Sequence, residues 1–372
     1  MKIGIMSMQR IINYGSFLQA WGLKHTLTRM GHTVEFVDYS VEPPISETTS
    51  LVRQRTQFWL RLVRLLNSDY RTKRKRDIRV NRIYTEFYNT FRERYLPLLG
   101  ITEARNVCPK LDVLIIGSDE VFNCFQTNVE VGYSLELFGK RNKAKRLLSY
   151  AASFGTTTIG DIIKFGKEKE LGELLARFDD LSVRDDNSAS IVQRLIGRQA
   201  KVHIDPVLLY DFGSEMSDVN IDLTDYIILY SYCDRFSEEE AAAAREFARQ
   251  KNKKLISLGF WQPCCDDYVS ASPFEVLAYF SKADCVITDT FHGTVLAIKY
   301  NKPFVSFVRE SNSEKMNDLL SRFGLVMRIV KDPDMLEETM EKDIDYLQVN
   351  RCICELQRDA ITYLRHTLND IT

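Results

Sequence analysis

The chain has 372 residues, which is too long for one ordinary hydrophobic core and long enough for two. Hydrophobic residues make up 45% of the sequence, as is usual in globular proteins, and no run of them approaches the ~20 apolar residues of a membrane-spanning helix. The formal net charge of −1 gives no sign that the whole chain binds polyanions.

The N-terminus and the cysteines indicate a cytoplasmic protein. The first ten residues, MKIGIMSMQR, lack the apolar core of a signal peptide and are interpreted as the start of a strand. The eight cysteines are scattered without CxxC spacing, which is typical of reduced thiols. Cys264 and Cys265 are adjacent but have no neighbouring histidine ligand, so we interpret the pair as incidental and predict no metal site.

The first part of the chain predicts a sheet that begins with a βαβ unit. Lys2–Met8 is an expected strand, Phe17–Met30 an amphipathic helix that Gly31 ends, and Thr33–Asp38 the next strand. This start is typical of dinucleotide-binding domains, although the GxGxxG fingerprint is absent. Later strands of the same sheet are expected at Leu111–Gly117, Arg146–Ala151, Asp180–Val183 and Lys201–Ile204.

A basic segment interrupts this first pattern. Arg53–Arg94 carries thirteen Lys or Arg residues against four Asp or Glu, a local charge of +9, and we predict a helical insertion at residues 50–95. Within it, Phe58–Leu66 sets apolar residues beside arginines, as in helices that lie on an anionic membrane surface, so 53–94 is a candidate for peripheral membrane contact. The alternative is a helix that docks on its own lobe or in a dimer. Nucleic acid is not an expected partner, because no nucleic-acid-binding fold accompanies the charge.

A second alternating pattern begins near Asp225. Strand YIILYSY is followed by helix SEEEAAAAREFARQK, strand KLISLGF, helix PFEVLAYFSKA, strand CVITD, helix GTVLAIKY, strand PFVSFV and helix EKMNDLLSRF. This alternation predicts a second parallel sheet covered by helices on both faces. We therefore expect an α/β protein of two Rossmann-like lobes, at 1–215 and 216–340, with a cleft between them. A helical tail at 341–372 is expected to pack back on the first lobe.

Polar residues follow four of the expected strands, where ligands bind in open α/β sheets. Each group lies where a helix N-terminus would point its N–H groups, which is a favourable position for an anion. Taken singly, each group also has a structural interpretation as a helix cap, a turn or a surface ion pair. The four groups are Asn13-Tyr14-Gly15-Ser16, Gly117-Ser118-Asp119-Glu120 with Asn123, Arg184-Asp185-Asp186, and Thr290-Phe291-His292-Gly293.

These four groups and one further segment resemble the polysaccharide pyruvyl transferase family. The matching segments are NYGSFLQAWGLKHTLTRMGHTVEFVDY, LIIGSDEVFN, SVRDDNS, HIDPVLL (His203–Leu209) and TDTFHGTVLAIKYNKPF. They occur in the family's order from Asn13 to about Leu325, so the resemblance covers most of the chain outside the basic insertion and the tail. No single motif is decisive, whereas five in order are strongly specific.

The resemblance implies a fold, an activity and partners. The fold would be like that of the two-lobed GT-B glycosyltransferases. The activity would be transfer of the enolpyruvyl unit of phosphoenolpyruvate to a sugar of a cell-surface polysaccharide or its precursor, which forms a pyruvate ketal. The saccharide acceptor can be lipid-linked in this family, which would place the protein in the cytoplasm, peripheral to the inner face of the membrane. No cofactor is implied, because phosphoenolpyruvate is a co-substrate.

The implied chemistry needs an acid that protonates the methylene carbon of the enol and groups that hold a carboxylate and a phosphate. His292 matches the histidine of the family's Phe-His-Gly motif and is the expected acid. The start of a helix destabilises an imidazolium, and Asp289 is expected to keep the ring protonated until it reacts. Gly293 is expected to leave room for the donor.

One position departs from the family. The best-studied members carry arginine before Phe-His-Gly, where this chain has Thr290, whose hydroxyl would bind the donor more weakly than a guanidinium. Three arginines after expected strands are candidates to replace it in donor binding, with ordinary surface arginines as the alternative: Arg184, Arg235 and Arg309.

The first lobe is expected to hold the acceptor. Asp119 is the expected catalytic group that accepts a proton from the attacking hydroxyl, and four polar residues are expected to bind acceptor hydroxyls: Asn13, Tyr14, Ser118 and Asn123. Two other functions are weighed against pyruvyl transfer. One is a GT-B-type glycosyltransferase that uses a nucleotide sugar, and the other is a non-catalytic relative that binds a saccharide or an assembly partner.

Overall fold

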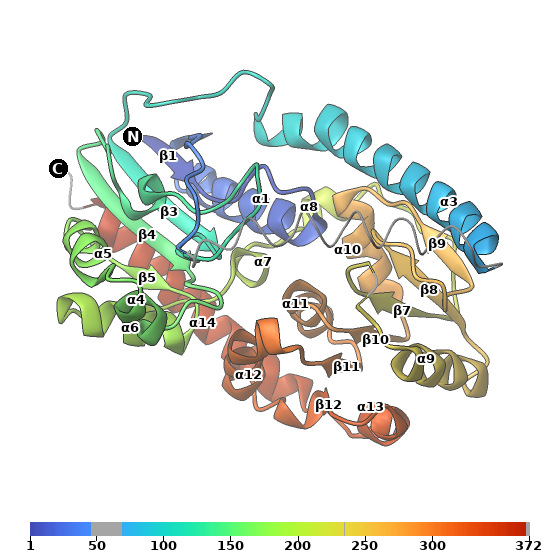
Figure 1. Ribbon diagram of the computed structural model, residues 1–372. Coiled ribbons are helices and arrows are strands. Elements are labelled where there is room, and N and C mark those ends of the chain that lie inside the picture. Colours follow the sequence, from blue (N-terminus) through green and yellow to red (C-terminus); the bar gives the residue numbers. More distant parts are fainter. Residues whose placement is uncertain (46–68, 234, 370–372) are drawn as a thin grey trace.

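The computed structural model describes residues 1–45, 69–233 and 235–369, and these form two lobes around two separate sheets (Figure 1). Both sheets are parallel and six-stranded, so the predicted two-lobed α/β class is confirmed. The first has the strand order β2-β1-β3-β4-β5-β6, and its strands are β1 (Lys2–Met6), β2 (Thr33–Phe36), β3 (Val113–Asp119), β4 (Arg146–Ala152), β5 (Ser182–Val183) and β6 (Lys201–Val202). The second has the order β12-β11-β10-β7-β8-β9, and its strands are β7 (Tyr226–Tyr230), β8 (Lys254–Leu258), β9 (Asp267–Val269), β10 (Cys285–Thr288), β11 (Phe304–Phe307) and β12 (Ile329–Val330).

Helices cover both faces of each sheet, which explains why the central strands are apolar on both sides. All four residues of β10 are buried, as are the first six of β3. The helices are α1 (Tyr14–Arg29), α3 (Asp69–Thr90), α4 (Ile159–Lys164), α5 (Glu168–Leu175), α6 (Asp186–Ile196), α7 (Pro206–Leu209), α8 (Gly213–Met216), α9 (Glu238–Gln250), α10 (Pro273–Lys282), α11 (Phe291–Lys299), α12 (Ser313–Arg322), α13 (Leu336–Glu341) and α14 (Tyr346–Asn369).

The strand orders place a topological switch point in each sheet. In the first sheet the chain leaves β1 for β2 on one side and returns to β3 on the other. In the second it leaves β7 for β8 and returns to β10 on the opposite side. Ligands of open α/β sheets bind outside the carboxyl ends of the strands at such a point, because the loops diverge there and leave a crevice.

The start of α1 differs from the predicted helix at Phe17–Met30. The helix begins at Tyr14, because the side chain of Asn13 accepts a hydrogen bond from the backbone N–H of Ser16 and caps it. Gly15 and Ser16 were expected to precede the helix and instead form its first turn. The first turn of α1 therefore lies directly at the end of β1.

The described part of the basic segment is the helix α3, which contacts both lobes. Its Phe87 ring lies 5.5 Å from Tyr14 of the first lobe and 5.9 Å from Phe260 of the second, measured between ring centroids. Figure 1 shows α3 running from the first lobe along the side of the second, near β8 and β9. The segment Phe58–Leu66, for which a membrane-surface helix is predicted, lies outside the described residues. Among residues 1–45, 69–233 and 235–369, no helix combines the length and apolar character needed to cross a membrane.

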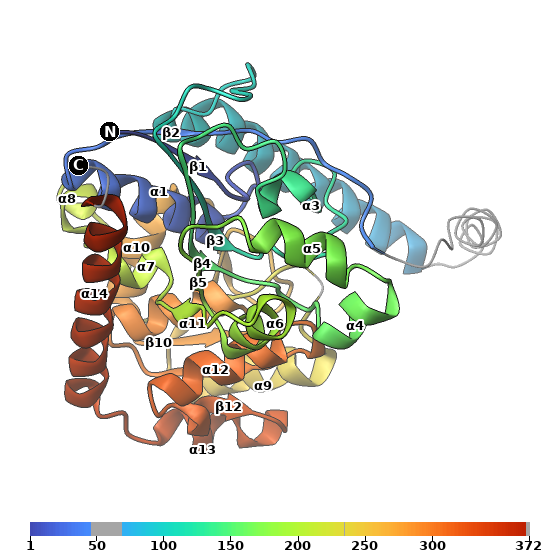
Figure 2. The same ribbon diagram turned by 90° about the vertical axis from the view of Figure 1, so that its left-hand side faces the viewer.

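The C-terminal helix α14 runs along one side of the molecule (Figure 2). Near its end, the hydroxyl of Tyr363 donates to the carbonyl of Ser149 in β4 at 3.0 Å. Near its start, the hydroxyl of Tyr346 donates to the carbonyl of Lys302, which belongs to the second lobe. The helix thus contacts both lobes and helps to hold them together.

Candidate active site

A cavity of about 340 Å³ lies between the lobes at the carboxyl ends of β1, β3, β7 and β10. These four strands flank the two switch points, so the topology itself accounts for its position. Its wall carries three cationic side chains, two carboxylates and one imidazole. The lining residues are Met8, Ile11, Asn13, Ser16, Asp119, Glu120, Asn123, Gln126, Thr156, Arg184, Tyr232, Arg235, Thr290, Phe291, His292, Ser311, Asn312 and Lys315.

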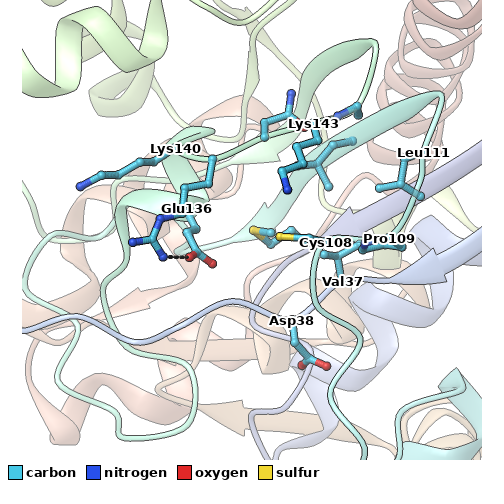
Figure 3. Close-up of a pocket in the computed structure, with 13 residues that line it drawn as sticks. Val37, Asp38, Cys108, Pro109, Leu111, Glu136, Lys140 and Lys143 are labelled. Carbon is cyan, nitrogen blue, oxygen red and sulfur yellow. Dashed lines mark hydrogen bonds and ion pairs between the residues drawn. The ribbon is translucent and has the colours of Figure 1, made fainter.

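Two other hollows are poorer candidates for a reaction site. The pocket in Figure 3, lined in part by Val37, Cys108 and Leu111, has a volume of about 30 Å³ and holds roughly one water molecule. An open groove of about 530 Å³ beside Arg10 lies on the first lobe alone. The Arg10 guanidinium is paired with Asp38, at 2.5 and 2.9 Å.

The end of β10 and the start of α11 hold His292 at the cavity. Thr290 is the N-cap of α11, and its hydroxyl accepts a hydrogen bond from the backbone N–H of Gly293 at 2.9 Å. A Cβ atom on Gly293 would lie 2.2 Å from the hydroxyl oxygen of Thr288. Glycine is therefore required at 293 because the helix starts against the strand end, a reason different from the expected room for the donor.

His292 lies where the two lobes touch. His292 is 9% exposed, and its Nε2 atom lies 3.6 Å from the Oδ2 atom of Asp205 in the first lobe. Its ring also faces the first turn of α1, because a Cβ atom on Gly15 would lie 2.2 Å from His292 Nδ1. The imidazole is thus supplied by one lobe and enclosed by the other.

Asp205, rather than Asp289, is the carboxylate that faces His292. Asp205 lies just before α7, and its side chain is almost fully buried. Burial alone would raise the pKa of this carboxyl, but the facing imidazole of His292 and the guanidinium of Arg184 lower it to about 2. Asp289, which was expected to keep His292 protonated, pairs instead with Arg309 and Arg235 at 3.0 and 3.1 Å.

Arg184 is a buried member of the cavity wall, in contrast to the alternative of a surface ion pair. Its Nη1 donates to Asp205 at 2.9 Å, and its guanidinium lies over the ring of Phe291, 4.3 Å from the centroid. Its Nη2 is 4.0 Å from Asp119. Its Nε atom is buried and has no hydrogen-bond partner among the described residues.

The other two candidate arginines have different surroundings. Arg235 lines the cavity, with 26% of its side chain exposed. Arg309 is outside the lining set, because its guanidinium donates to both oxygens of Glu240, at 2.6 and 2.8 Å, and to Asp289. Arg309 therefore supports the strand end that carries Asp289, and Arg235 is the one of this pair that reaches the cavity.

Asp119 and Asn123 come together on the first-lobe side of the cavity. Asp119 accepts a hydrogen bond from the Ser16 hydroxyl at 2.7 Å and has a backbone φ of +80°, which is costly for a residue with a side chain. The amide of Asn123 donates to Glu120 at 2.8 Å. Asn13 also lines the cavity while it caps α1.

Tyr14 and Ser118 lie behind the cavity wall. The hydroxyl of Tyr14 donates to the carbonyl of Ala271 in the second lobe at 2.5 Å, so this residue joins the lobes. Ser118 is fully buried within β3, and its carbonyl accepts the Ser7 hydroxyl. Of the sequence-predicted site residues, Tyr14, Ser118, Gly293 and Arg309 are outside the lining set, and the structure brings the remaining seven together.

The sequence interpretation missed an ion pair that crosses the cavity. The ammonium of Lys315, in the first turns of α12, pairs with Glu120 after β3. Burial would raise the pKa of Glu120, but the charge and hydrogen bond of Lys315 lower it to about 2. Lys315 had a usable signal, since it lies near the start of a helix predicted directly after a strand. In the part of the chain that the structure describes, no group of three or more His, Cys, Asp or Glu side chains could hold a metal ion.

Comparison with known proteins yields one family match. A family model described as polysaccharide pyruvyl transferase matches residues 13–312. A comparison with curated proteins found no match.

Solved structures are similar at a low level. They include a UDP-GlcNAc 2-epimerase from Neisseria meningitidis bound to UDP-GlcNAc, with 11% identity, a TM-score of 0.46 and all of both chains covered. The S. aureus MnaA–UDP co-structure has 9% identity and a TM-score of 0.49, and covers 99% of this chain and 96% of its own. The spinosyn rhamnosyltransferase SpnG has 11% identity and a TM-score of 0.47, again over all of both chains. The assignment of two Rossmann-like lobes rests on the two sheets of the chain itself.

Proposed function

The chain belongs to the polysaccharide pyruvyl transferase family, and we propose from this that it transfers the enolpyruvyl unit of phosphoenolpyruvate to a saccharide and closes a pyruvate ketal on two of its hydroxyls. The observation that carries the proposal is the content of the interlobe cavity. An imidazole at a helix start, three cations and two carboxylates surround one volume of about 340 Å³. This set can supply an acid, a base and a binding site for a donor with two anionic groups.

The donor carries a carboxylate and a phosphate, and both need positive partners. Arg184, Arg235 and Lys315 all line the cavity. We propose that these three cations do the work of the family's arginine at the position of Thr290. Thr290 contributes its hydroxyl beside them, and Arg309 acts indirectly by holding Asp289, the partner of Arg235.

Helix starts reinforce these cations. The N-terminal turns of α1 and α11 meet at the cavity, where Asn13, Thr290 and His292 are among the lining residues. The partial positive charge of a helix N-terminus favours an anion such as the leaving phosphate. The donor phosphate is therefore expected at the start of α11, beside Thr290.

This arrangement supports the following reaction as part of the proposal. His292 gives a proton to the methylene carbon, which becomes the methyl group, and a saccharide hydroxyl attacks the neighbouring carbon while Asp119 takes its proton. The second hydroxyl then attacks the same carbon, the bond from that carbon to the phosphate oxygen breaks, and the proton of this hydroxyl leaves with inorganic phosphate. One phosphoenolpyruvate and two hydroxyls thus give one ketal and one phosphate.

The first-lobe side of the cavity is proposed to bind the acceptor. Asn13, Asn123 and Gln126 are amides that suit sugar hydroxyls, because each amide group both donates and accepts. Tyr232, which lines the opposite side, adds an aromatic surface. An acceptor bound by these groups would have its attacking hydroxyl next to Asp119, which takes the proton.

Phosphate release from phosphoenolpyruvate in the presence of candidate saccharides tests the proposal. We expect phosphate release that depends on both the saccharide and His292, with a ketal product visible by mass spectrometry. Release of UDP or GDP from nucleotide sugars instead would favour the glycosyltransferase alternative. Saccharide binding without either release would favour a non-catalytic relative.

A further inference from the structure

The acid proposed for the reaction is assembled from both lobes. His292 comes from α11 in the second lobe, and Asp205, 3.6 Å from its Nε2 atom, comes from the loop before α7 in the first. This distance is longer than a hydrogen bond and within that of an ion pair. A shift of the lobes of less than 1 Å would bring the two atoms into hydrogen-bonding range.

Asp205 is held in one orientation. Its Oδ1 atom accepts the backbone N–H of Val207 at 2.9 Å, and its Oδ2 atom accepts from Arg184, also at 2.9 Å. Only 1% of its side chain is exposed. A carboxylate fixed in this way interacts strongly with a facing imidazole, because little water screens the pair.

The imidazole is equally constrained. The first turn of α1 closes one side of the ring at Gly15, and Phe291 packs edge-on at 5.4 Å between ring centroids. The charged groups that face the ring from the other elements are Arg184 after β5 and, across the cavity, Asp119, Glu120, Arg235 and Lys315. All three carboxylates have a cation beside them, Arg184 for Asp119 and Asp205 and Lys315 for Glu120, and Asp205 is the one in ion-pair contact with the ring.

We propose that Asp205 is a positioning residue for His292, which orients the Nε2–H of the imidazole. Asp205 touches neither donor nor acceptor in this role and acts through the histidine. The role gives a reason for the position of the acid at the contact between the lobes, since its orienting partner comes from the other lobe. The inference rests on the proposed function, in which His292 is the acid.

The test compares the full-length chain with its Asp205→Asn variant by ¹⁵N NMR, without any substrate. The His292 signal is assigned by its loss in His292→Asn. We expect the ¹⁵N shifts of the neutral His292 ring to show a larger share of the Nδ1-protonated tautomer in Asp205→Asn, since the carboxylate that faces Nε2 is gone. Asp359→Asn, which removes a carboxylate beside another histidine, His203, is the matched control and should leave His292 unchanged. An unchanged His292 tautomer ratio in a folded Asp205→Asn protein would overturn the proposal.

A measurement on the unmodified protein covers the case in which Asp205→Asn does not fold because Arg184 loses its partner. The ¹⁵N shifts of neutral His292 report which ring nitrogen carries the proton. Because Asp205 is an acceptor that faces Nε2, we expect the proton on Nε2. A proton on Nδ1 would contradict the proposal.

Turnover separates this inference from the proposed function. If phosphate release is observed, kcat should fall in Asp205→Asn with little change in the KM for phosphoenolpyruvate, and it should recover in Asp205→Glu, which restores the carboxylate. If no phosphate is released by the unmodified protein while the NMR results hold, the proposed function fails and the Asp205–His292 pairing stands.

Discussion

Two regions of this molecule each place a buried histidine beside an aspartate, and they differ in what surrounds the carboxylate. In the cavity, His292 Nε2 is 3.6 Å from Asp205. Beneath α14, His203 Nε2 is 3.4 Å from Asp359. The side chain of Asp205 is 1% exposed and that of Asp359 is 67% exposed. The distances are nearly equal, so distance alone does not distinguish the two regions.

The difference teaches that the solvation of the carboxylate decides the role of the histidine. Water screens Asp359, and an exposed ion pair contributes little. Burial consequently dominates and lowers the pKa of His203 to about 4, which leaves it neutral at physiological pH. The neutral ring of His203 is packed in the protein interior. Its Nδ1 atom is 2.7 Å from the Ser182 hydroxyl, and its ring centroid lies 4.5 Å from that of Tyr363. His292 keeps a dry, charged partner and faces a cavity.

The largest expected effect comes from removing the cavity histidine. His292→Asn should lower the rate of phosphate release from phosphoenolpyruvate ~10²–10⁴-fold, because the general acid is lost. The fold should persist, since asparagine is tolerated at helix starts. The matched variant His203→Asn should leave the rate constant per folded molecule unchanged. Full activity of His292→Asn would show that His292 is structural, and Asp289 or Asp119 would be the next candidates for the acid.

The pH dependence of the unfolding free energy should reveal the low pKa of His203. The pKa of His203 is about 4 in the folded protein and ~6.5 when unfolded, so the unfolded chain binds the proton first as the pH falls. The contribution of neutral His203 to the unfolding free energy is fully present above about pH 6.5. Up to ~3 kcal/mol of it is lost as the pH falls from about 6.5 to 4. Urea unfolding of the wild type and His203→Gln across this range measures it. The difference between the two proteins isolates His203 from the carboxyl groups, and a difference that did not vary with pH would contradict the assignment.

The cap of the helix that holds His292 should have a smaller effect. Thr290→Ala removes the hydroxyl that accepts from Gly293, which should cost about 1 kcal/mol of unfolding free energy. Under the proposed function, Thr290→Ala should also weaken the binding of phosphoenolpyruvate, with little change in turnover. Thermal unfolding and the KM for phosphoenolpyruvate measure the two effects. Thr290→Ser, which keeps the hydroxyl, is the control and should behave as the wild type.

The smallest expected effect comes from replacing Asp359, the exposed carboxylate beside His203. Asp359→Asn should change the unfolding free energy by less than ~0.5 kcal/mol, because a solvated partner contributes little. Turnover should be unaffected. A loss of several kcal/mol in urea unfolding would mean that Asp359 acts as a buried charge, and the contrast with Asp205 would fail.

The sequence by itself determined the elements and the strand ends at which ligands are expected. Alternating apolar runs predicted two parallel sheets, because strands buried on both faces are apolar throughout. The residues after β3 and β10 were identified as site candidates, since ligands of parallel sheets bind at the carboxyl ends of the strands. His292, Asp119 and Arg184 were therefore found from local patterns and from the family's motifs, and all three line the cavity.

The tertiary structure alone decided which partner each of these residues has. Asp289 is close to His292 in the chain, yet the carboxylate that faces the imidazole is Asp205, from the other lobe. Lys315 pairs with Glu120, likewise across the lobes. Tyr14, expected in the cavity, instead donates to Ala271 of the opposite lobe. Sequence patterns report the periodicity of single elements, whereas these contacts depend on how two independently formed sheets dock, and no local pattern records that geometry.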